Sequence, residues 1–147
     1  MPIVLLLRAD IFDFFREGAM AKILVIDDEH GIRDLLDTLL SRKGYDVVVA
    51  DSGQKGLEVY RRAHPDVVVL DLKMPGMDGL TVLQQIRRLN PTQPVVILTG
   101  AGSPESEQQV RALGVTEYVE KEFSLHLLGD ALKRLLIHPE PLNILSR

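Results

Sequence analysis

The chain of 147 residues contains no cysteine and no long apolar run. Without cysteine it can hold neither a disulfide framework nor a zinc–thiolate site, and it has no thiol nucleophile. The longest apolar run near the N-terminus, residues 3–7, is far shorter than the ~20 residues of a membrane span. It is also shorter than the core of a signal peptide and lacks the basic residues that precede one. These absences predict a soluble, cytoplasmic protein that makes no contact with a membrane.

An excess of basic charge is also missing. Lys and Arg total 17 against 21 Asp and Glu, which gives a formal net charge of −4. Proteins that bind nucleic acid normally carry a basic patch or stripe, so we expect no direct binding of nucleic acid. Basic pairs do occur at 42–43, 61–62, 87–88 and 133–134, each near the end of an expected helix. We interpret them as complements to the helix dipole rather than as a phosphate-binding surface.

The chain divides into three segments. Residues 1–19 hold Phe12, Phe14 and Phe15, three of the four phenylalanines, and the sequence restarts at Met20 as a separate protein would. We expect this segment to be an extension outside the core, with an amphipathic anchor or a dimer-forming arm as the alternative. Residues 20–137 form one domain, and residues 138–147 form a C-terminal tail with two prolines.

Short apolar runs alternate with helical spacing throughout the domain. Runs typical of strands buried on both faces occupy 23–26, 47–49, 67–70 and 95–98, and a shorter strand is expected at 117–120. Between and after them, apolar residues recur every three or four positions, which predicts helices around 32–40, 57–63, 80–89, 104–113 and 125–136. Strands that alternate with helices in this way predict an α/β fold with a parallel sheet covered on both faces.

The residues that follow each expected strand indicate where the chemistry lies. In an open parallel sheet, ligands bind at the carboxyl ends of the strands. Asp51 and Ser52 follow the second strand and are the least distinctive set. The other four strands are followed by acids, by a hydroxyl with a glycine, or by a lysine: Asp27, Asp28, Glu29, Asp71, Thr99, Gly100 and Lys121.

Converging carboxylates repel one another unless a cation joins them, and hard oxygen ligands of this kind suit Mg²⁺. A carboxylate nucleophile, a metal ion and donors for the equatorial oxygens are what an in-line phosphoryl transfer requires. Either Asp27 or Asp28 taken singly is equally well explained as a helix cap. The complete set after the correct strands favours the chemical explanation.

Four motifs carry a resemblance to a known family. They are Ile-Leu-Val-Ile-Asp-Asp-Glu at 23–29, Val-Leu-Asp-Leu-Lys-Met-Pro-Gly-Met-Asp-Gly at 69–79, Leu-Thr-Gly at 98–100 and Tyr-Val-Glu-Lys at 118–121. In order and spacing they resemble a response-regulator receiver domain, the phosphoacceptor of bacterial two-component systems, from residue 21 to about 137. The resemblance implies a flavodoxin-like, doubly wound sheet of five parallel strands in the order 2-1-3-4-5 with five helices.

The resemblance also assigns roles to the acids. Asp71 matches the aspartate that is phosphorylated. Asp27 and Asp28 match the acidic pair that holds Mg²⁺, with Asp71 and the backbone carbonyl of Lys73 as further ligands. The chain is therefore expected to be a switch that accepts a phosphoryl group, rather than an enzyme that turns over a substrate, apart from slow autodephosphorylation.

Three further residues match the contacts and the switch of the family. Thr99 and Lys121 match the hydroxyl and the ammonium that contact the phosphoryl group. Tyr118 matches the aromatic residue that turns inward when Thr99 is drawn to the phosphate. The alternative for Tyr118 is an edge-strand aromatic that packs on the last expected helix.

One position departs from the family pattern. Lys121 is followed by Glu122 and Phe123, where the family normally has Lys-Pro-Phe joined by a cis peptide bond. A cis bond before proline costs only ~0.5–1 kcal/mol, but before glutamate it costs roughly 2.5–4 kcal/mol. We therefore predict a trans bond between Lys121 and Glu122, with a rearranged loop.

The resemblance implies partners as well. A histidine kinase or phosphotransfer protein would donate the phosphoryl group, and a downstream protein would bind the face made by 104–113, 117–120 and the helix around 125–136. No DNA-binding segment is evident in the sequence.

The alternative functions are an aspartyl phosphohydrolase of the haloacid-dehalogenase type, a phosphorylation-independent docking module and a flavodoxin. Each fits the sequence less well. The phosphohydrolase needs an Asp-x-Asp pattern after the first strand, where this chain has adjacent Asp27 and Asp28. A docking module would lack Asp71, Thr99 or Lys121, and a flavodoxin needs a Ser/Thr/Gly-rich loop after the first strand.

Overall fold

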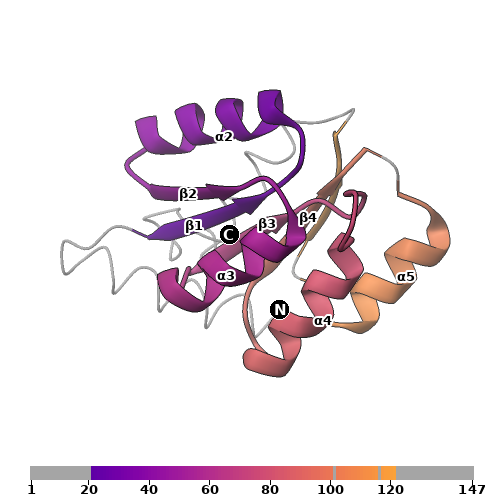
Figure 1. The fold of residues 1–147 in the computed structure, drawn as a ribbon. Helices are drawn as coiled ribbons and strands as arrows, with labels where there is room; N and C mark the ends of the chain where they lie inside the picture. Colours follow the sequence, from indigo (N-terminus) through magenta and orange to yellow (C-terminus); the bar gives the residue numbers. More distant parts are fainter. Residues whose placement is uncertain (1–20, 101, 116, 122–147) are drawn as a thin grey trace, which may run out of the picture.

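The structure is a computed structural model that describes residues 21–100, 102–115 and 117–121 (Figure 1). In this part of the chain strands and helices alternate from β1 to β5. The strands are β1 (Lys22–Ile26), β2 (Asp46–Ala50), β3 (Val67–Leu70), β4 (Val95–Thr99) and β5 (Glu117–Glu120). The helices are α2 (His30–Arg42), α3 (Gly53–Ala63), α4 (Gly79–Leu89) and α5 (Pro104–Ala112).

All five strands are parallel and form one sheet in the order β2-β1-β3-β4-β5. This confirms the predicted fold class and strand order. Four of the five expected helices lie in the described residues, and the expected helix around 125–136 lies outside them. The paired strands are in register at their ends, so that Ile26 of β1 lies opposite Leu70 of β3. The residues that follow these two strands are therefore neighbours.

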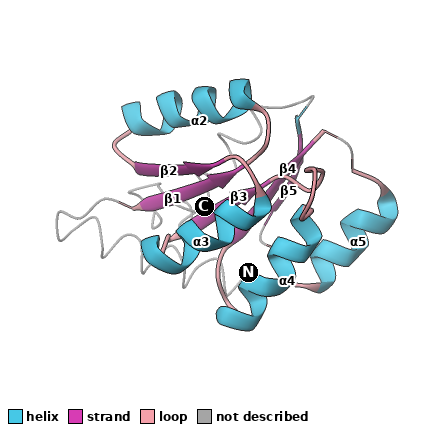
Figure 2. Ribbon diagram, in the orientation of Figure 1, coloured by secondary structure: helices cyan, strands magenta, loops and turns pink. Residues whose placement is uncertain are grey.

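The sheet has an apolar cluster on each face. Successive residues of a strand point to opposite sides, and accordingly Ile23 and Val25 belong to one cluster while Leu24 and Ile26 belong to the other. α2 covers the first face, and α3, α4 and α5 cover the second (Figure 2). Because both faces are covered, the central strands are apolar at nearly every position, as the sequence indicated.

Three of the four described helices begin with a side-chain cap. Ser52 caps α3, Asp78 caps α4, and Ser103 caps α5 in a reciprocal capping box with Ser106. The residue at the same position of α2 is Glu29, whose side chain makes no capping hydrogen bond. The Glu29 carboxylate is therefore available for another contact.

A network of hydrogen bonds from one guanidinium to neutral carbonyl oxygens lies where β4 and β5 begin. The guanidinium of Arg87, in the last turn of α4, donates to the carbonyl oxygens of Leu113, Gln93 (2.7 Å) and Gly114 (3.0 Å). The buried side chain of Gln93 in turn accepts a hydrogen bond of 2.9 Å from the Tyr60 hydroxyl. The helix-end position expected for Arg87 is confirmed, and its side chain additionally ties α4 to the loop that follows α5.

None of the helices described between residues 21 and 121 is long and apolar enough to cross a membrane.

Candidate functional site

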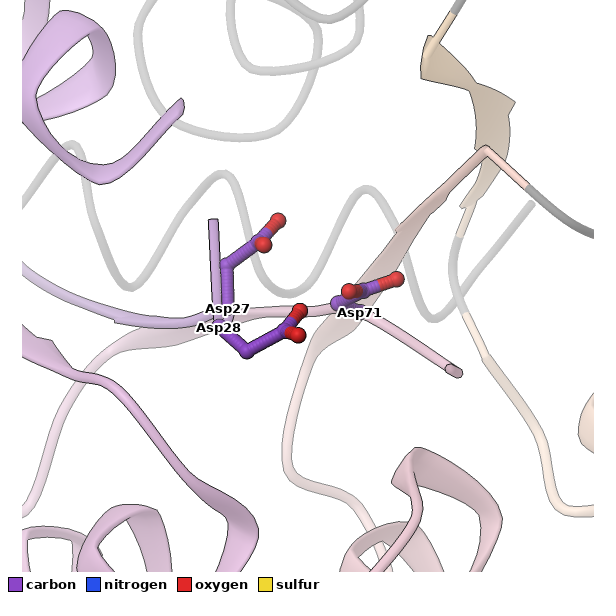
Figure 3. Close-up of side chains that lie close together, drawn as sticks. All are labelled: Asp27, Asp28 and Asp71. Carbon is purple, nitrogen blue, oxygen red and sulfur yellow. The ribbon is translucent and has the colours of Figure 1, made fainter. Parts of the chain in front are cut away.

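Two neighbouring strands deliver three carboxylates to one edge of the sheet. Asp27 and Asp28 directly follow β1, and Asp71 directly follows β3. One carboxylate oxygen from each of the three lies within 4.8 Å of the others (Figure 3). The convergence predicted from the strand ends is therefore present in the structure.

The three acids differ in their exposure. Asp27 is 2% exposed and Asp71 is 3% exposed, whereas Asp28 is exposed to solvent. The backbone holds the two buried residues, because the Asp71 N–H donates to the Ile26 carbonyl (2.9 Å) and a carboxylate oxygen of Asp27 accepts from the Glu29 N–H (2.9 Å). The site thus has a fixed, buried floor and one acid at its mouth.

Lys121 brings an ammonium group to this cluster from the end of β5. Its Nζ lies 3.0 Å from an oxygen of Asp27 and 3.4 Å from an oxygen of Asp71, and it also contacts the Glu29 carboxylate. The Lys121 side chain is 10% exposed. A lysine 94 residues from Asp27 in sequence is therefore an immediate neighbour of the acids, as the strand-end argument predicts.

Burial and like charge alter the protonation of the cluster. Burial, followed by the neighbouring Asp27 charge, raises the pKa of Asp71 to about 7, although Lys121 opposes the shift. Burial likewise raises the pKa of Asp27 against the hydrogen bonds from Glu29 and Lys121. Burial lowers the pKa of Lys121, but the carboxylates of Glu29 and Asp27 outweigh it and the net shift is upward. Burial therefore disfavours the negative charges of Asp71 and Asp27, which a bound cation would stabilise.

The donor set fits a magnesium ion. Carboxylate oxygens are the ligands that Mg²⁺ prefers, and it commonly keeps several waters, for which the exposed side of Asp28 leaves room. The backbone N–H of Lys73 donates to an Asp71 oxygen at 3.4 Å, so Lys73 lies beside the cluster. The role of its carbonyl as a ligand stays a prediction.

A glycine allows α4 to begin directly against the site. A Cβ at Gly79 would lie 2.1 Å from the Asp71 carbonyl oxygen and 2.6 Å from the Leu72 Cα. No side chain fits at that distance, because both neighbours are backbone atoms. The Asp78-Gly79 pair in the motif therefore has two structural roles, with Asp78 capping the helix and Gly79 allowing its close approach.

The two expected switch residues lie on neighbouring strands. Thr99 is the last residue of β4 and is fully buried, and Tyr118 lies on β5, the adjacent strand, opposite Ile97. The Tyr118 hydroxyl occupies the space beside Gly102, where a Cβ would lie 1.9 Å from it, and the Arg111 guanidinium lies 5.8 Å from the ring centroid. Tyr118 therefore contacts α5, while the alternative of packing on the helix around 125–136 lies outside the described residues.

Glu29 belongs to the acidic run after the first strand, but the sequence pattern predicted no role for it. A third consecutive acid was the only available signal. A contact with a lysine 92 residues away depends on the direction of one side chain, which the sequence pattern does not determine. The contacts of Arg87 with Leu113 and Gly114 were missed for the same reason.

Two further predictions made from the sequence lie outside the described part of the chain. They concern the Lys121–Glu122 bond and residues 1–19.

Comparison with known proteins agrees with this geometry. Residues 23–133 match the sequence model of the family described as the response regulator receiver domain. Among curated relatives, sporulation initiation phosphotransferase F of Bacillus subtilis is 35% identical over 115 residues, which cover 78% of this chain and 93% of that protein. The probable transcriptional regulator ycf27 of Porphyridium aerugineum is 44% identical over 115 residues, and the chain spans about half of that longer protein, 48%.

Solved structures show the same similarity. The chemotaxis protein CheY4 of Vibrio cholerae is 34% identical with a TM-score of 0.74, over 80% of this chain and 100% of that one. The response regulator TrrA of Thermotoga maritima, solved in complex with Mg²⁺-BeF, is 36% identical with a TM-score of 0.72 over the same shares.

Proposed function

Because the chain belongs to the response-regulator receiver family, we propose that it is a phosphorelay switch that accepts a phosphoryl group on Asp71. The observation that carries the proposal is the contact of Lys121 with Asp27 and Asp71 in a cluster that also contains Asp28. A buried carboxylate with an ammonium beside it and further acids within 4.8 Å suits phosphoryl transfer and is difficult to explain as a purely structural feature.

In the proposed reaction an oxygen of the Asp71 carboxylate attacks phosphorus. The new bond joins that oxygen to phosphorus, and the bond from phosphorus to the donor nitrogen of phosphohistidine breaks, its electron pair leaving with the imidazole. Lys121 and Thr99 stabilise the negative charge on the equatorial oxygens. The burial of Asp71 and Thr99 keeps bulk water away from the reacting carboxylate.

Magnesium is the proposed cofactor. Asp27, Asp28, Asp71 and the backbone carbonyl of Lys73 would hold it, the first three through carboxylate oxygens that the structure brings together. When bound, Mg²⁺ neutralises the acids and stabilises charge on the transferring oxygens. The raised pKa of Asp71, about 7, is consistent with a site that gains from a cation.

We further propose that the phosphoryl group changes the surface around Tyr118. Thr99 moves toward the new dianion, and Tyr118 on the neighbouring strand then turns inward. The surface that responds consists of α5, β5 and residues 125–136, the last outside the described part. Only Val110 of α5 is buried, so this helix can shift at a low cost in lost packing.

The proposed donor is a histidine kinase or phosphotransfer protein, and the proposed target is a protein that binds the responding surface. We propose that residues 20–137 form the receiver domain that carries out this function. The proposed location is the cytoplasm. Hydrolysis of the acyl phosphate, partly self-catalysed, returns the switch to its starting state.

Intact-mass analysis after incubation with acetyl phosphate tests the proposal. We expect one phosphoryl group per chain with Mg²⁺ and none with EDTA, and no gain for Asp71→Asn. Asp51→Asn is the matched control, since Asp51 follows β2 at the same edge but lies outside the carboxylate cluster. A gain that persists in Asp71→Asn would disprove the assignment. Rapid release of phosphate without accumulation of a phosphorylated chain would favour a phosphohydrolase instead, because a receiver accumulates the acyl phosphate and hydrolyses it slowly.

A further inference from the structure

Glu29 contacts Lys121 without belonging to the carboxylate cluster. It occupies the N-cap position of α2, yet its carboxylate does not cap the helix and instead lies against the Lys121 ammonium. Its backbone N–H is held by Asp27 (2.9 Å), which fixes where the side chain starts. The position of Glu29 therefore results from the same turn that places Asp27.

The partners of Lys121 differ in how easily they can leave. Asp27 and Asp71 are 2% and 3% exposed and directly follow buried strands, so their positions are fixed. The Glu29 side chain is 57% exposed, whereas that of Lys121 is 10% exposed. Glu29 can therefore turn into solvent at little cost, while the other two carboxylates stay in place.

We propose that Glu29 is a positioning residue that holds the Lys121 ammonium at the mouth of the site and restrains phosphorylation of Asp71. The inference rests on the proposed function, in which Lys121 has to contact the phosphoryl oxygens. To do so the ammonium has to give up the Glu29 carboxylate, which competes with the incoming group for the same cation. The rate of phosphorylation then depends on how readily this ion pair opens.

A small phosphoryl donor makes no protein–protein contact, so its reaction measures the effect of Glu29 on phosphorylation without any contribution from binding to a kinase. With acetyl phosphate, the bond from phosphorus to the acetate oxygen breaks as the bond to Asp71 forms, and acetate leaves with the electron pair. No proton has to move, so Glu29 takes no part as an acid or base. Its influence is on the availability of Lys121, and the neutral isostere Glu29→Gln removes the ionic attraction while keeping the side-chain size.

The first measurement is the rate of phosphorylation by acetyl phosphate at saturating Mg²⁺. We expect Glu29→Gln to raise the rate about two- to five-fold, the range covered by exposed ion pairs. Asp34→Asn is the matched control, because Asp34 is an exposed acid on α2 that pairs with His30 instead. An unchanged rate in Glu29→Gln, or an equal rise in Asp34→Asn, would overturn the inference.

The second measurement is the affinity for beryllofluoride, a stable mimic of the phosphoryl group, by calorimetry at saturating Mg²⁺. Glu29→Gln should tighten binding in the presence of Lys121 and have no effect in a Lys121→Met background. An equal tightening in both backgrounds would show that Glu29 acts only through general charge repulsion, which contradicts a positioning role. If the wild-type protein takes up no phosphoryl group, the proposed function fails. If it does and Glu29→Gln behaves like wild type, only this inference fails.

Discussion

The two ends of the sheet each contain one long basic side chain with several oxygen partners. At the carboxyl ends of the strands, Lys121 contacts the carboxylates of Asp27, Asp71 and Glu29. Where β4 and β5 begin, Arg87 donates to neutral backbone carbonyls, among them those of Gln93 and Gly114. The partners are negatively charged at one end and neutral at the other.

This difference separates a site whose ionic partners can be exchanged from one whose partners are fixed backbone carbonyls. The carboxylates around Lys121 outnumber it, so the cluster gains from any added cation and tolerates exchange of partners. The carbonyls around Arg87 belong to the backbone, and removing the guanidinium leaves them without a donor. We therefore expect substitutions at the Lys121 end to alter the chemistry and substitutions at the Arg87 end to alter the stability.

The largest expected effect is that of Lys121→Met on phosphorylation. Removing a preorganised charge that stabilises a transition state commonly slows a reaction by about a hundred-fold or more. We expect a loss of that size in the rate of mass gain with acetyl phosphate and Mg²⁺. Arg87→Met should react at the wild-type rate. Comparable losses in the two variants would contradict the division between the two ends.

The next effect is the loss of stability in Arg87→Met. Carbonyls of Leu113 and Gly114 lose their donor, and unsatisfied groups cost about 1–3 kcal/mol each when buried. Because part of this network is exposed, we expect a decrease of about 2 kcal/mol in the free energy of unfolding by urea. Tyr60→Phe, which removes the hydrogen bond from the Tyr60 hydroxyl to Gln93, is the milder control and should cost about 1 kcal/mol.

A smaller effect is expected from removing the charge of Asp71 in the presence of EDTA. The pKa of Asp71 is about 7 in the folded protein and 3.8 in a model peptide, so the folded state binds the proton more tightly between these values. The stability of the wild type should therefore fall as pH rises from about 4 to 7. Asp71→Asn should be more stable than wild type at pH 8, and the difference should vanish near pH 4.

The check is urea unfolding at both pH values. Saturating Mg²⁺ should reduce the difference in unfolding free energy between Asp71→Asn and wild type at pH 8, because it stabilises the wild type. A difference of the same size at pH 4 and pH 8 would mean that the charge of Asp71 is not its cause.

The smallest expected effect is that of removing residues 1–19. A chain that starts at Met20 should unfold within ~1 kcal/mol of the full chain and be phosphorylated at the same rate. Circular dichroism and the mass assay test the two statements. Aggregation or unfolding of the shortened chain would show that Phe12, Phe14 and Phe15 contribute to a core or a dimer interface.

Most features that depend on the course of the backbone, namely the strands and the residues that follow them, were predicted from the sequence. Wholly apolar runs such as 67–70 predicted buried parallel strands, and the strand-end rule then brought Asp27, Asp28, Asp71 and Lys121 together. This worked because a strand fixes the position of the residue that follows it to within a few ångströms. The strand order itself rested on the resemblance of the motifs to a known family.

What the sequence did not predict depends on the direction of long side chains. Glu29 and Arg87 each reach a partner far along the chain, at Lys121 and at Leu113 and Gly114. Both side chains have several rotatable bonds, so their positions at the ends of helices do not determine which residue they contact. The place of Tyr118 likewise depends on the space that Gly102 leaves for its hydroxyl, which follows from packing and from no local pattern.

The sequence separation of 94 residues between Asp27 and Lys121 has a consequence for synthesis on the ribosome. The acids leave the exit tunnel long before the lysine, and β5, which carries it, is the last strand of the described sheet to emerge. An incomplete chain therefore presents the acids without their cation, and on the proposed mechanism it is a poor phosphoacceptor. The reactive state arises only after the edge strand has docked, so a nascent or C-terminally degraded chain would transmit little signal.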